Sequence, residues 1–296
     1  MPQSDLPVIG FVGLGNMGMP MATRLVDAGY RVLGFDVAEP VREAFGAAGG
    51  SPVDSVGDTA LGADLLVLML PDSTVVNAVL SDAGLRENLR PGTTVVDMSS
   101  SEPIKTRALA AQLDERGVVL IDAPVSGGVK GAVSGSLTIM VGGPAATVAE
   151  VVPVLEHLGR PVHAGPVGSG HAIKALNNLL SATHLLATSE AMLAGRRFGL
   201  DPEIMLSIFN SSSGKSGSTE NKWPNFILPG TYNSGFGLRL MLKDMRTATD
   251  LADQLDVPDE LGKAAVDLWA RAAGELEPTA DHTEIAKWLA GREVGL

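Results

Sequence analysis

The chain has 296 residues, of which 45% are hydrophobic and 19% are charged, a balance typical of a folded globular protein rather than a disordered one. Its formal net charge of −12 argues against sequence-independent nucleic-acid binding, which needs a basic surface. Because it contains no cysteine, disulfides, thiolate metal sites and cysteine nucleophiles are excluded.

The first half of the chain alternates between short apolar runs and segments with helical spacing. This alternation predicts an α/β fold, a doubly wound parallel sheet of the Rossmann kind with helices on both faces. In chain order, the expected strands are 8–12, 31–35, 65–70, 93–97, 118–122 and 136–141. The expected helices are 19–28, 41–48, one that starts at 75, 104–116 and 148–158.

The pattern changes after about residue 165. Residues 172–197 are predicted to form one long helix, followed by further helices with loops at 211–219 and 229–237. The serine- and glycine-rich loop at 211–219 could act as a mobile lid. We therefore expect an α/β domain at 1–164 and an all-helical domain at 165–296 that includes the long helix.

The turn after the first expected strand has the composition of a dinucleotide-binding turn. Gly13 permits a tight turn, Gly15 lets the backbone approach a pyrophosphate, and Gly18 lets helix and strand pack closely. Free N–H groups at the start of the following helix would face the phosphates. A glycine-rich turn alone is weak evidence, but this one lies between an expected strand and an expected helix. The residues that fit G-x-G-x-x-G are Gly13, Leu14, Gly15, Asn16, Met17 and Gly18.

Asp36 ends the second expected strand, about 20 residues after the glycine turn, where a ribose-binding acid is expected. Its carboxylate can accept hydrogen bonds from ribose hydroxyls and would repel a 2′-phosphate. Val37 follows it, where an NADP enzyme would benefit from Arg or Ser. The residues therefore favour NAD over NADP, with a plain turn residue as the alternative interpretation of Asp36.

Gly170, Lys174 and Asn178 are spaced four residues apart at the start of the long helix, so they share one face. The functional interpretation makes Lys174 the proton carrier, since a positioned ammonium can stabilise the oxygen of a carbonyl that accepts hydride. Asn178 would then hold the substrate. The alternative is a surface lysine beside a structural asparagine. His171 is interpreted as a structural or capping residue, and no metal site is expected because no ligand spacing is present.

Taken together, these segments resemble the β-hydroxyacid dehydrogenase family over nearly the whole chain. The segments that carry the resemblance are GLGNMGMPMA at 13–22, MLP at 69–71, DMSS at 97–100, DAPVSGG at 122–128, GSGHAIKALNN at 168–178 and LKDM at 242–245. The resemblance implies oxidation of a small 3-hydroxy acid, with NAD as the hydride acceptor and Lys174 as the general acid/base.

The resemblance also implies roles for further residues. Leu70, Pro71, Ser100 and Lys243 would contact the cofactor, together with the glycine turn. The substrate carboxylate would be held by Ser126, Gly127 and Gly128, and Asn178 would contact the substrate as well. Taken alone, these three could form an ordinary glycine turn, and Lys243 could simply pair with Asp244.

The chain departs from the family pattern at a few positions. Arg24 and Val75 stand where the family often has Asn and a polar residue, and Ser100 stands where Thr is usual. The segment 210–219, which includes Lys215, is also less standard. These departures leave the identity of the hydroxy acid open.

Four rival functions remain at this point. A semialdehyde reductase, for tartronate semialdehyde or a related compound, would use the same residues in the opposite direction with NAD(P)H. An imine reductase is disfavoured by the presence of Lys174, and a sugar-phosphate dehydrogenase by the short helical domain, although Lys215 and Arg239 could meet a second anion. A non-catalytic NAD-binding scaffold is a rival of a different class.

The remaining expectations concern partners and location. A long apolar helix next to a small helical domain predicts a homodimer or homotetramer. The partner is otherwise a small carboxylate-bearing substrate, with no nucleic acid and no membrane. Residues 1–6 do not resemble a signal peptide, and no apolar run reaches about 18 residues, so a cytoplasmic location is expected.

Overall fold

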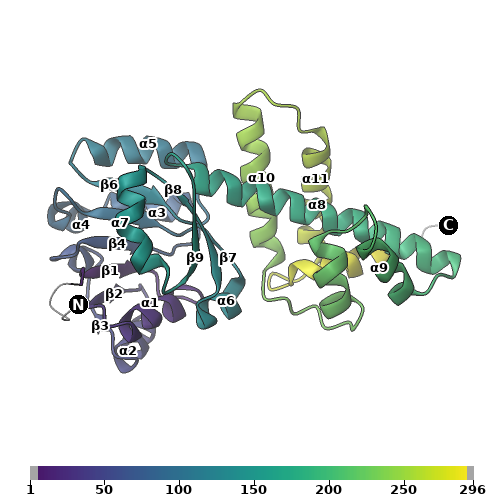
Figure 1. Ribbon diagram of the computed structural model, residues 1–296, viewed down its shortest axis with the longest axis horizontal. Coiled ribbons are helices and arrows are strands. Elements are labelled where there is room, and N and C mark those ends of the chain that lie inside the picture. Colours follow the sequence, from purple (N-terminus) through teal and green to yellow (C-terminus); the bar gives the residue numbers. More distant parts are fainter. Residues whose placement is uncertain (1–5, 292–296) are drawn as a thin grey trace. The chain divides into compact units, whose positions relative to one another are not determined.

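The computed structural model describes residues 6–291, so residues 1–5, on which the prediction about a signal peptide depends, lie outside it. The chain divides into two compact units, residues 1–174 and 175–296, here called the N-terminal and C-terminal units (Figure 1). Within the described range, no helix is long and apolar enough to cross a membrane.

The N-terminal unit is built on one sheet, which has nine strands within residues 6–174 (Figure 1). The order β3-β2-β1-β4-β5-β6 is parallel and matches the 3-2-1-4-5-6 order of dinucleotide-binding folds. The fold-class prediction is therefore confirmed. At the other edge, however, β8 runs antiparallel to β6 and β7, so the expectation of a wholly parallel sheet is wrong there. The strands are β1 (Ile9–Val12), β2 (Val32–Phe35), β3 (Ser51–Pro52), β4 (Leu65–Leu68), β5 (Thr94–Asp97), β6 (Val119–Asp122), β7 (Val125–Ser126), β8 (Leu137–Gly142) and β9 (Gly159–Gly165).

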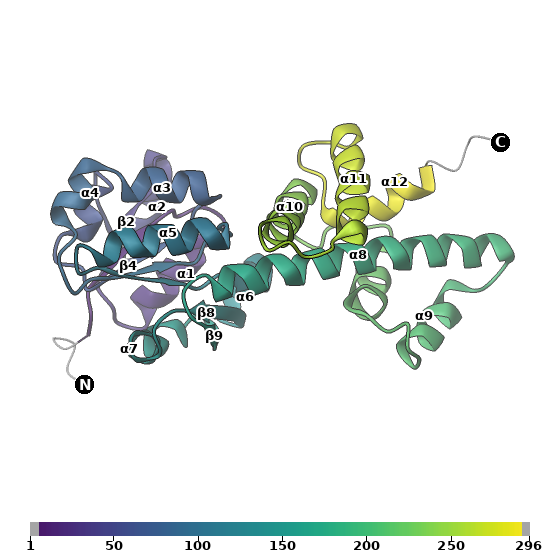
Figure 2. The same cartoon turned by 90° about the horizontal axis from the view of Figure 1, so that it is seen from above.

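Successive residues of the central strands point to opposite faces and join different cores. On β1, Phe11 packs in the core that includes residues of α1, α2, α6 and α7, whereas its neighbour Val12 packs in the core of α3, α4 and α5. Figure 2 shows α3, α4 and α5 on one side of the sheet and α7 on the other. The helices are α1 (Gly18–Asp27), α2 (Glu39–Ala47), η2 (Gly57–Ala60), α3 (Ser73–Leu80), α4 (Ala83–Asn88), α5 (Pro103–Asp114), α6 (Gly128–Ser134) and α7 (Ala145–Leu155).

Arg24, a departure from the family pattern, links α1 to the segments beside it. Its Nε donates to the carbonyl oxygen of His157 at 2.8 Å, and its Nη1 donates to that of Val133 at 3.1 Å. An asparagine at this position is too short to make both contacts, since it lacks the arginine side chain's reach and forked donors. The departure therefore affects packing at the end of α6 and α7 rather than the glycine turn.

The long helix α8 (Ser169–Phe198) passes through the division between the units, beginning three residues before the expected start. The C-terminal unit is helical, with a core around Met192, Met245, Trp269 and Ile285, all fully buried. All three tryptophans of the chain, Trp223, Trp269 and Trp288, lie in this core. The elements after α8 are α9 (Pro202–Asn210), the π-helix η3 (Ser218–Ile227), α10 (Leu238–Gln254), α11 (Glu260–Glu275), η4 (His282–Glu284) and α12 (Ile285–Gly291).

The expected loop at 211–219 is shorter than predicted. Ser218 and Thr219 are 2% exposed and form the first turn of η3, so they belong to the packed part of the unit. The hydroxyl of Thr219 donates to the carbonyl oxygen of Ser216 at 2.9 Å, which fixes this end of the segment. The polar composition therefore predicted a loop at two residues, Ser218 and Thr219, that are in fact buried.

Candidate active site

The turn between β1 and α1 contains three glycines, and each position has a different relation to its surroundings. Gly13 has a φ of +94°, and a Cβ there would collide with the carbonyl oxygen of Met69. A Cβ on Gly18 would collide with the carbonyl oxygen of Gly13. Gly15, by contrast, is exposed, and a Cβ there would meet no heavy atom of the protein within 4 Å. Nothing in the protein requires glycine at position 15, so its lack of a side chain leaves room for a ligand.

The rest of the turn presents backbone rather than side chains to that space. The side chain of Leu14 is 1% exposed and lies in the core, Asn16 is exposed, and Met17 packs partly against the core. Helix α1 begins after Met17 with no side-chain cap and no acidic residue in its first turn. The unpaired N–H groups and positive dipole end of such a helix suit a phosphate. This turn therefore fits the pyrophosphate of a dinucleotide.

Asp36 lies at the end of β2 and faces the turn. Its Oδ2 accepts a hydrogen bond from the backbone N–H of Leu14 at 2.9 Å, and its Oδ1 accepts one from Ala38 at 3.0 Å. Each carboxylate oxygen retains a second lone pair for a ribose hydroxyl. Sequence reasoning missed Arg42, whose guanidinium donates to the carbonyl oxygen of Asp36 at 2.8 Å. The acid is thus fixed in place before any cofactor arrives.

Leu70, Pro71 and Ser100 lie on the two loops that follow β4 and β5. These loops are joined because the backbone N–H of Leu70 donates to the hydroxyl of Ser99 at 2.9 Å. Strands β4 and β5 are parallel neighbours, so both loops leave the same edge of the sheet. The structure therefore brings together the two segments to which the sequence assigned cofactor contacts, and it adds Ser99, which sequence reasoning missed.

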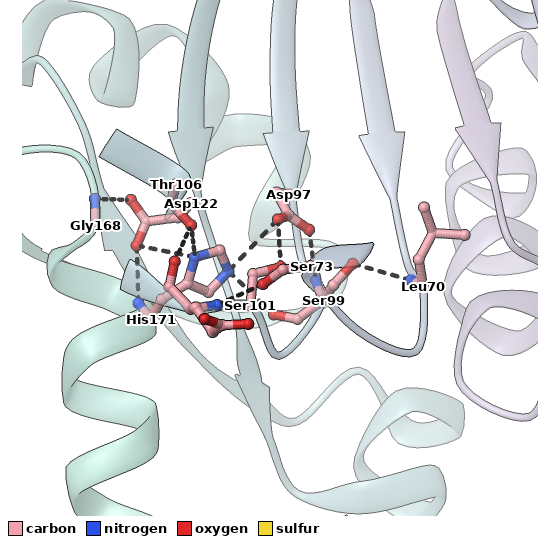
Figure 3. Close-up of polar contacts among 10 residues, drawn as sticks. Leu70, Ser73, Asp97, Ser99, Ser101, Thr106, Asp122, Gly168 and His171 are labelled. Carbon is pink, nitrogen blue, oxygen red and sulfur yellow. Dashed lines mark hydrogen bonds and ion pairs between the residues drawn. The ribbon is translucent and has the colours of Figure 1, made fainter. Parts of the chain in front are cut away.

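A buried polar network lies at this edge of the sheet, around Asp97, Asp122 and His171 (Figure 3). All three side chains are almost completely buried. The imidazole Nε2 is 3.7 Å from Oδ2 of Asp97, and Nδ1 is 3.9 Å from Oδ2 of Asp122. The ring also contacts the carbonyl oxygen of Ser99 through Nε2 at 3.1 Å and the hydroxyl of Thr106 through Nδ1 at 2.8 Å. We call Asp97, Ser99, Thr106, Asp122 and His171 together the edge network.

Asp122 caps the N-terminus of α8 from a distant part of the chain. Its Oδ1 accepts a hydrogen bond from the backbone N–H of Gly168 at 2.6 Å, and its Oδ2 accepts one from that of His171 at 2.8 Å. These contacts satisfy N–H groups that a helix start leaves without partners. Burial raises the pKa of Asp122, while the His171 imidazole and the two N–H donors oppose that rise.

Two glycines make room for this carboxylate. A Cβ on Gly142 would collide with the side chain of Asp122, and a Cβ on Gly170 would lie 2.9 Å from its Oδ2 and collide with the carbonyl oxygen of Met140. The crowded neighbours of Gly170 are thus the β8 backbone and Asp122. The glycine lets α8 start against the sheet.

Lys174 lies in the second turn of α8, three residues after His171, and the residue is 7% exposed. It is the last residue of the N-terminal unit. A lysine buried to this degree is unusual, since burial disfavours an ammonium group unless partners are present. Its burial is compatible with the role of proton carrier that the sequence suggested.

Ser126, Gly127 and Gly128 form the turn from β7 into α6. Gly127 has a φ of +132° and Gly128 a φ of +60°, a region that glycine tolerates far better than other residues. A Cβ on Gly127 would approach Leu137 at 3.2 Å, whereas one on Gly128 would meet nothing within 4 Å. Packing therefore accounts for the first glycine, and open space lies beside the second.

In the C-terminal unit, Asn178 and Lys243 are linked by a residue that the sequence analysis treated only as an ion-pair partner. The side-chain amide of Asn178 donates to Oδ2 of Asp244 at 2.6 Å, and the ammonium of Lys243 is 3.3 Å from its Oδ1. Asn178 and Asp244 are 5% and 3% exposed. The side-chain amide of Asn177 donates to Oδ1 of Asn178 at 3.2 Å. The signal that could have identified Asp244 was the LKDM segment itself.

The two cations considered for a second anion have protein partners. The ammonium of Lys215 is 3.0 Å from Oε1 of Glu220, and Nη2 of Arg239 donates to the carbonyl oxygen of Ala273 at 2.7 Å. Across residues 6–291 no group of three or more His, Asp or Glu side chains is arranged to hold a metal ion.

Comparison with known proteins relates both parts of the chain to dehydrogenases. Residues 8–168 match the family model described as the NAD binding domain of 6-phosphogluconate dehydrogenase, and residues 168–289 match that described as NAD-binding of NADP-dependent 3-hydroxyisobutyrate dehydrogenase. An NAD-dependent L-serine dehydrogenase from Pseudomonas aeruginosa is 39% identical over 269 residues, which cover 88% of this chain and 90% of that protein.

Two further proteins are similar over almost the entire chain. The mitochondrial 3-hydroxyisobutyrate dehydrogenase of Rattus norvegicus is 38% identical over 293 residues, covering 96% of this chain and 88% of that protein. The structure titled Mycobacterium tuberculosis 3-hydroxyisobutyrate dehydrogenase with L-serine has a TM-score of 0.91 and 31% identity, and covers 96% of this chain and 99% of that one. The chain belongs to the β-hydroxyacid dehydrogenase family of NAD-dependent oxidoreductases.

Proposed function

We propose that this protein oxidises the primary alcohol of a small 3-hydroxy acid, with NAD as the hydride acceptor and Lys174 as the general acid/base. The names of the similar proteins support this substrate class. L-Serine and 3-hydroxyisobutyrate both have a hydroxymethyl group on the carbon that carries the carboxylate, and they differ only in the third substituent of that carbon. The substrate proposed here has that common framework.

The observation that carries the proposal is the placement of Lys174. The residue is in the second turn of α8, directly after the helix start that is fastened to the cofactor edge of the sheet. When bound, NAD supplies an electrophilic ring carbon that accepts hydride from the alcohol carbon. Lys174 in its neutral form takes the alcohol proton in that direction, and as an ammonium it returns the proton and stabilises the carbonyl oxygen in the reverse direction.

The other residues bind and orient. The glycine turn, from Gly13 to Gly18, holds the pyrophosphate, and Asp36 holds the ribose. Leu70, Pro71, Ser100 and Lys243 contact the cofactor nearer its reactive end. Each of these contacts is assigned from the family pattern and is compatible with the local geometry described above.

Ser126, Gly127, Gly128 and Asn178 are assigned to the substrate. Backbone N–H groups of the glycine turn hold the substrate carboxylate, and the amide of Asn178, held by Asp244, orients the substrate. We further propose that residues 1–164 bind NAD, that residues 165–296 complete the substrate site, and that the protein assembles as a homodimer or homotetramer. A cytoplasmic location stays a prediction.

The test is a panel of hydroxy acids and semialdehydes assayed by the change in NADH absorbance. It should include L-serine, 3-hydroxyisobutyrate and the matching semialdehydes, with NAD(H) and NADP(H) compared. Lys174→Ala should lower kcat by about 10²-fold or more, because general acid/base catalysis contributes about 10²–10⁴-fold, while NAD binding is retained. Lys287→Ala, at a lysine whose side chain is 64% exposed on α12, is the matched control and should change little.

The outcomes separate the rival functions. Turnover only with semialdehydes would favour the reductase. NAD binding without turnover of any compound, unaffected by Lys174→Ala, would favour the scaffold and contradict the proposal.

A further inference from the structure

The start of α8 is fastened to the sheet by a carboxylate instead of by its own capping residue. Asp122, at the end of β6, accepts hydrogen bonds from the N–H groups of Gly168 and His171, which lie 46 and 49 residues further along the chain. A local serine or aspartate would cap the helix equally well without linking it to the sheet. This arrangement fixes both the rotation of the first turn and its distance from β6.

The imidazole of His171 fastens the same turn to a second place. Its Nε2 donates to the carbonyl oxygen of Ser99 at 3.1 Å, because a carbonyl oxygen can only accept. The hydroxyl of Ser99 in turn accepts from the N–H of Leu70 at 2.9 Å, and the N–H of Ser99 donates to Oδ1 of Asp97 at 3.0 Å. The first turn of α8 is thus connected to both loops that carry the cofactor residues Leu70, Pro71 and Ser100 (Figure 3).

Lys174 follows His171 by three residues of continuous helix, a rise of about 4.5 Å. A rotation or shift of the first turn is passed directly to Lys174, since the helix between them is rigid. Burying two carboxylates and an imidazole is also costly compared with apolar packing, so stability alone does not account for this network.

We infer that Asp122 and His171 are positioning residues that set where Lys174 lies relative to the two cofactor loops. This inference rests on the proposed role of Lys174. Neither residue touches the reacting atoms, and each acts through the backbone of α8. Because a displacement of about 1 Å can lower a rate by about 10²-fold, the expected effect falls on kcat rather than on cofactor binding.

The first test uses Asp122→Asn and His171→Asn. Asp122→Asn places an amide NH₂ against the N–H of Gly168 or His171, so one of the two hydrogen bonds becomes a clash of donors. His171→Asn keeps the Nδ1 position next to Thr106 but loses the contact of Nε2 with Ser99. Each should lower kcat by about 10- to 100-fold, with the dissociation constant of NAD changed by no more than about threefold. The solvent deuterium isotope effect on kcat should increase, because proton transfer through a displaced Lys174 becomes slower.

A matched pair of milder variants protects the test against loss of folding. Thr106→Val removes a hydroxyl that contacts the ring and also donates to the carbonyl oxygen of Glu102 at 3.0 Å. Thr59→Val removes a similarly buried hydroxyl, in η2, that donates to the carbonyl oxygen of Val56 and lies outside the edge network. Both should lower Tm by a similar amount. Only Thr106→Val should lower kcat and increase the isotope effect, so it carries the test if Asp122→Asn does not fold.

The results separate this inference from the proposed function. Wild-type protein that turns over no compound in the panel contradicts the proposed function. Active wild-type protein with an inactive Lys174→Ala variant, and with His171→Asn and Thr106→Val both within twofold of wild type in kcat and isotope effect, overturns the positioning role alone.

Discussion

The side-chain amide of Asn178 donates to the carboxylate of Asp244 over 2.6 Å, and both groups are buried in the C-terminal unit. The other oxygen of that carboxylate is 3.3 Å from the ammonium of Lys243. One acid on α10 therefore fixes two residues that the family pattern assigns to substrate and cofactor.

Replacing Asp244 tests this arrangement. Asp244→Asn removes the charge that pairs with Lys243 and weakens the acceptor for Asn178, and hydrogen bonds to charged groups contribute about 1.5–3 kcal/mol. We expect kcat/KM for the hydroxy acid to fall by about 10-fold or more. Steady-state kinetics with both substrates varied will measure this, and Asp250→Asn, an exposed acid on the same helix, should leave kcat/KM unchanged. Equal effects of the two substitutions would contradict the assignment.

Two glycines of the first turn should respond differently to alanine. Gly15→Ala adds a methyl group where the protein has open space, so the fold should be unaffected while KM for NAD rises by about 10-fold or more. Gly18→Ala places a methyl group against the carbonyl oxygen of Gly13, and overpacking of this kind costs about 1–3 kcal/mol. Urea denaturation and NAD titration distinguish the two. Normal NAD binding by Gly15→Ala would show that the space is not used by the cofactor.

Asp36 should govern the choice of cofactor. Asp36→Asn removes the negative charge that repels a 2′-phosphate and weakens the hydrogen bonds to ribose, so KM for NAD should rise by about 10-fold and the preference for NAD over NADP should narrow. Arg42, whose guanidinium is next to the Asp36 backbone, can then meet the phosphate. Parallel KM measurements with NAD and NADP check this, and Asp54→Asn, at an exposed acid of the same unit, serves as the control. An unchanged ratio would remove Asp36 from the ribose site.

His282 should make the protein less stable in mild acid. Burial, followed by the positive charge of Lys222, lowers the pKa of His282 to about 4 from an ordinary 6.5. Between those values the unfolded chain binds a proton that the folded protein does not, so the free energy of unfolding falls as the pH drops through that interval. At pH 7 almost none of this loss has occurred, and by about pH 4 the free energy of unfolding has fallen by about 3 kcal/mol. Urea denaturation across this range should show a smaller pH dependence for His282→Asn, and an identical dependence would contradict the assignment.

Much of the N-terminal unit could be predicted from sequence because its central strands are short, apolar and bounded by turns. Strand β9 (Gly159–Gly165) was missed because GRPVHAG has neither an apolar run nor an alternation, and most of its residues are partly exposed. The antiparallel direction of β8 could not be read either, since periodicity carries no information about pairing partners. Helix α6 was also missed, because it begins with one glycine and contains another, and glycine locally favours a turn over a helix.

The site was predicted unevenly for a related reason. Residues in recognisable segments, such as Gly13 and Lys174, could be named as candidates because a motif carries its own spacing. Asp97 and Asp122 were part of those segments but received no role, because their partners are on α8 and on loops far along the chain. The general signal, an acid as the last residue of a buried strand, was present in both cases. Tertiary contacts of this type become visible only when the strand ends are placed side by side.

The placement of the tryptophans means that intrinsic fluorescence reports on one unit only. Trp223, Trp269 and Trp288 are all in the helical core of the C-terminal unit, so intrinsic tryptophan fluorescence does not report unfolding of the Rossmann sheet. Far-ultraviolet circular dichroism reports the secondary structure of both units. A protein whose halves melt separately would therefore show two transitions by dichroism and a single one by fluorescence, without any label being attached.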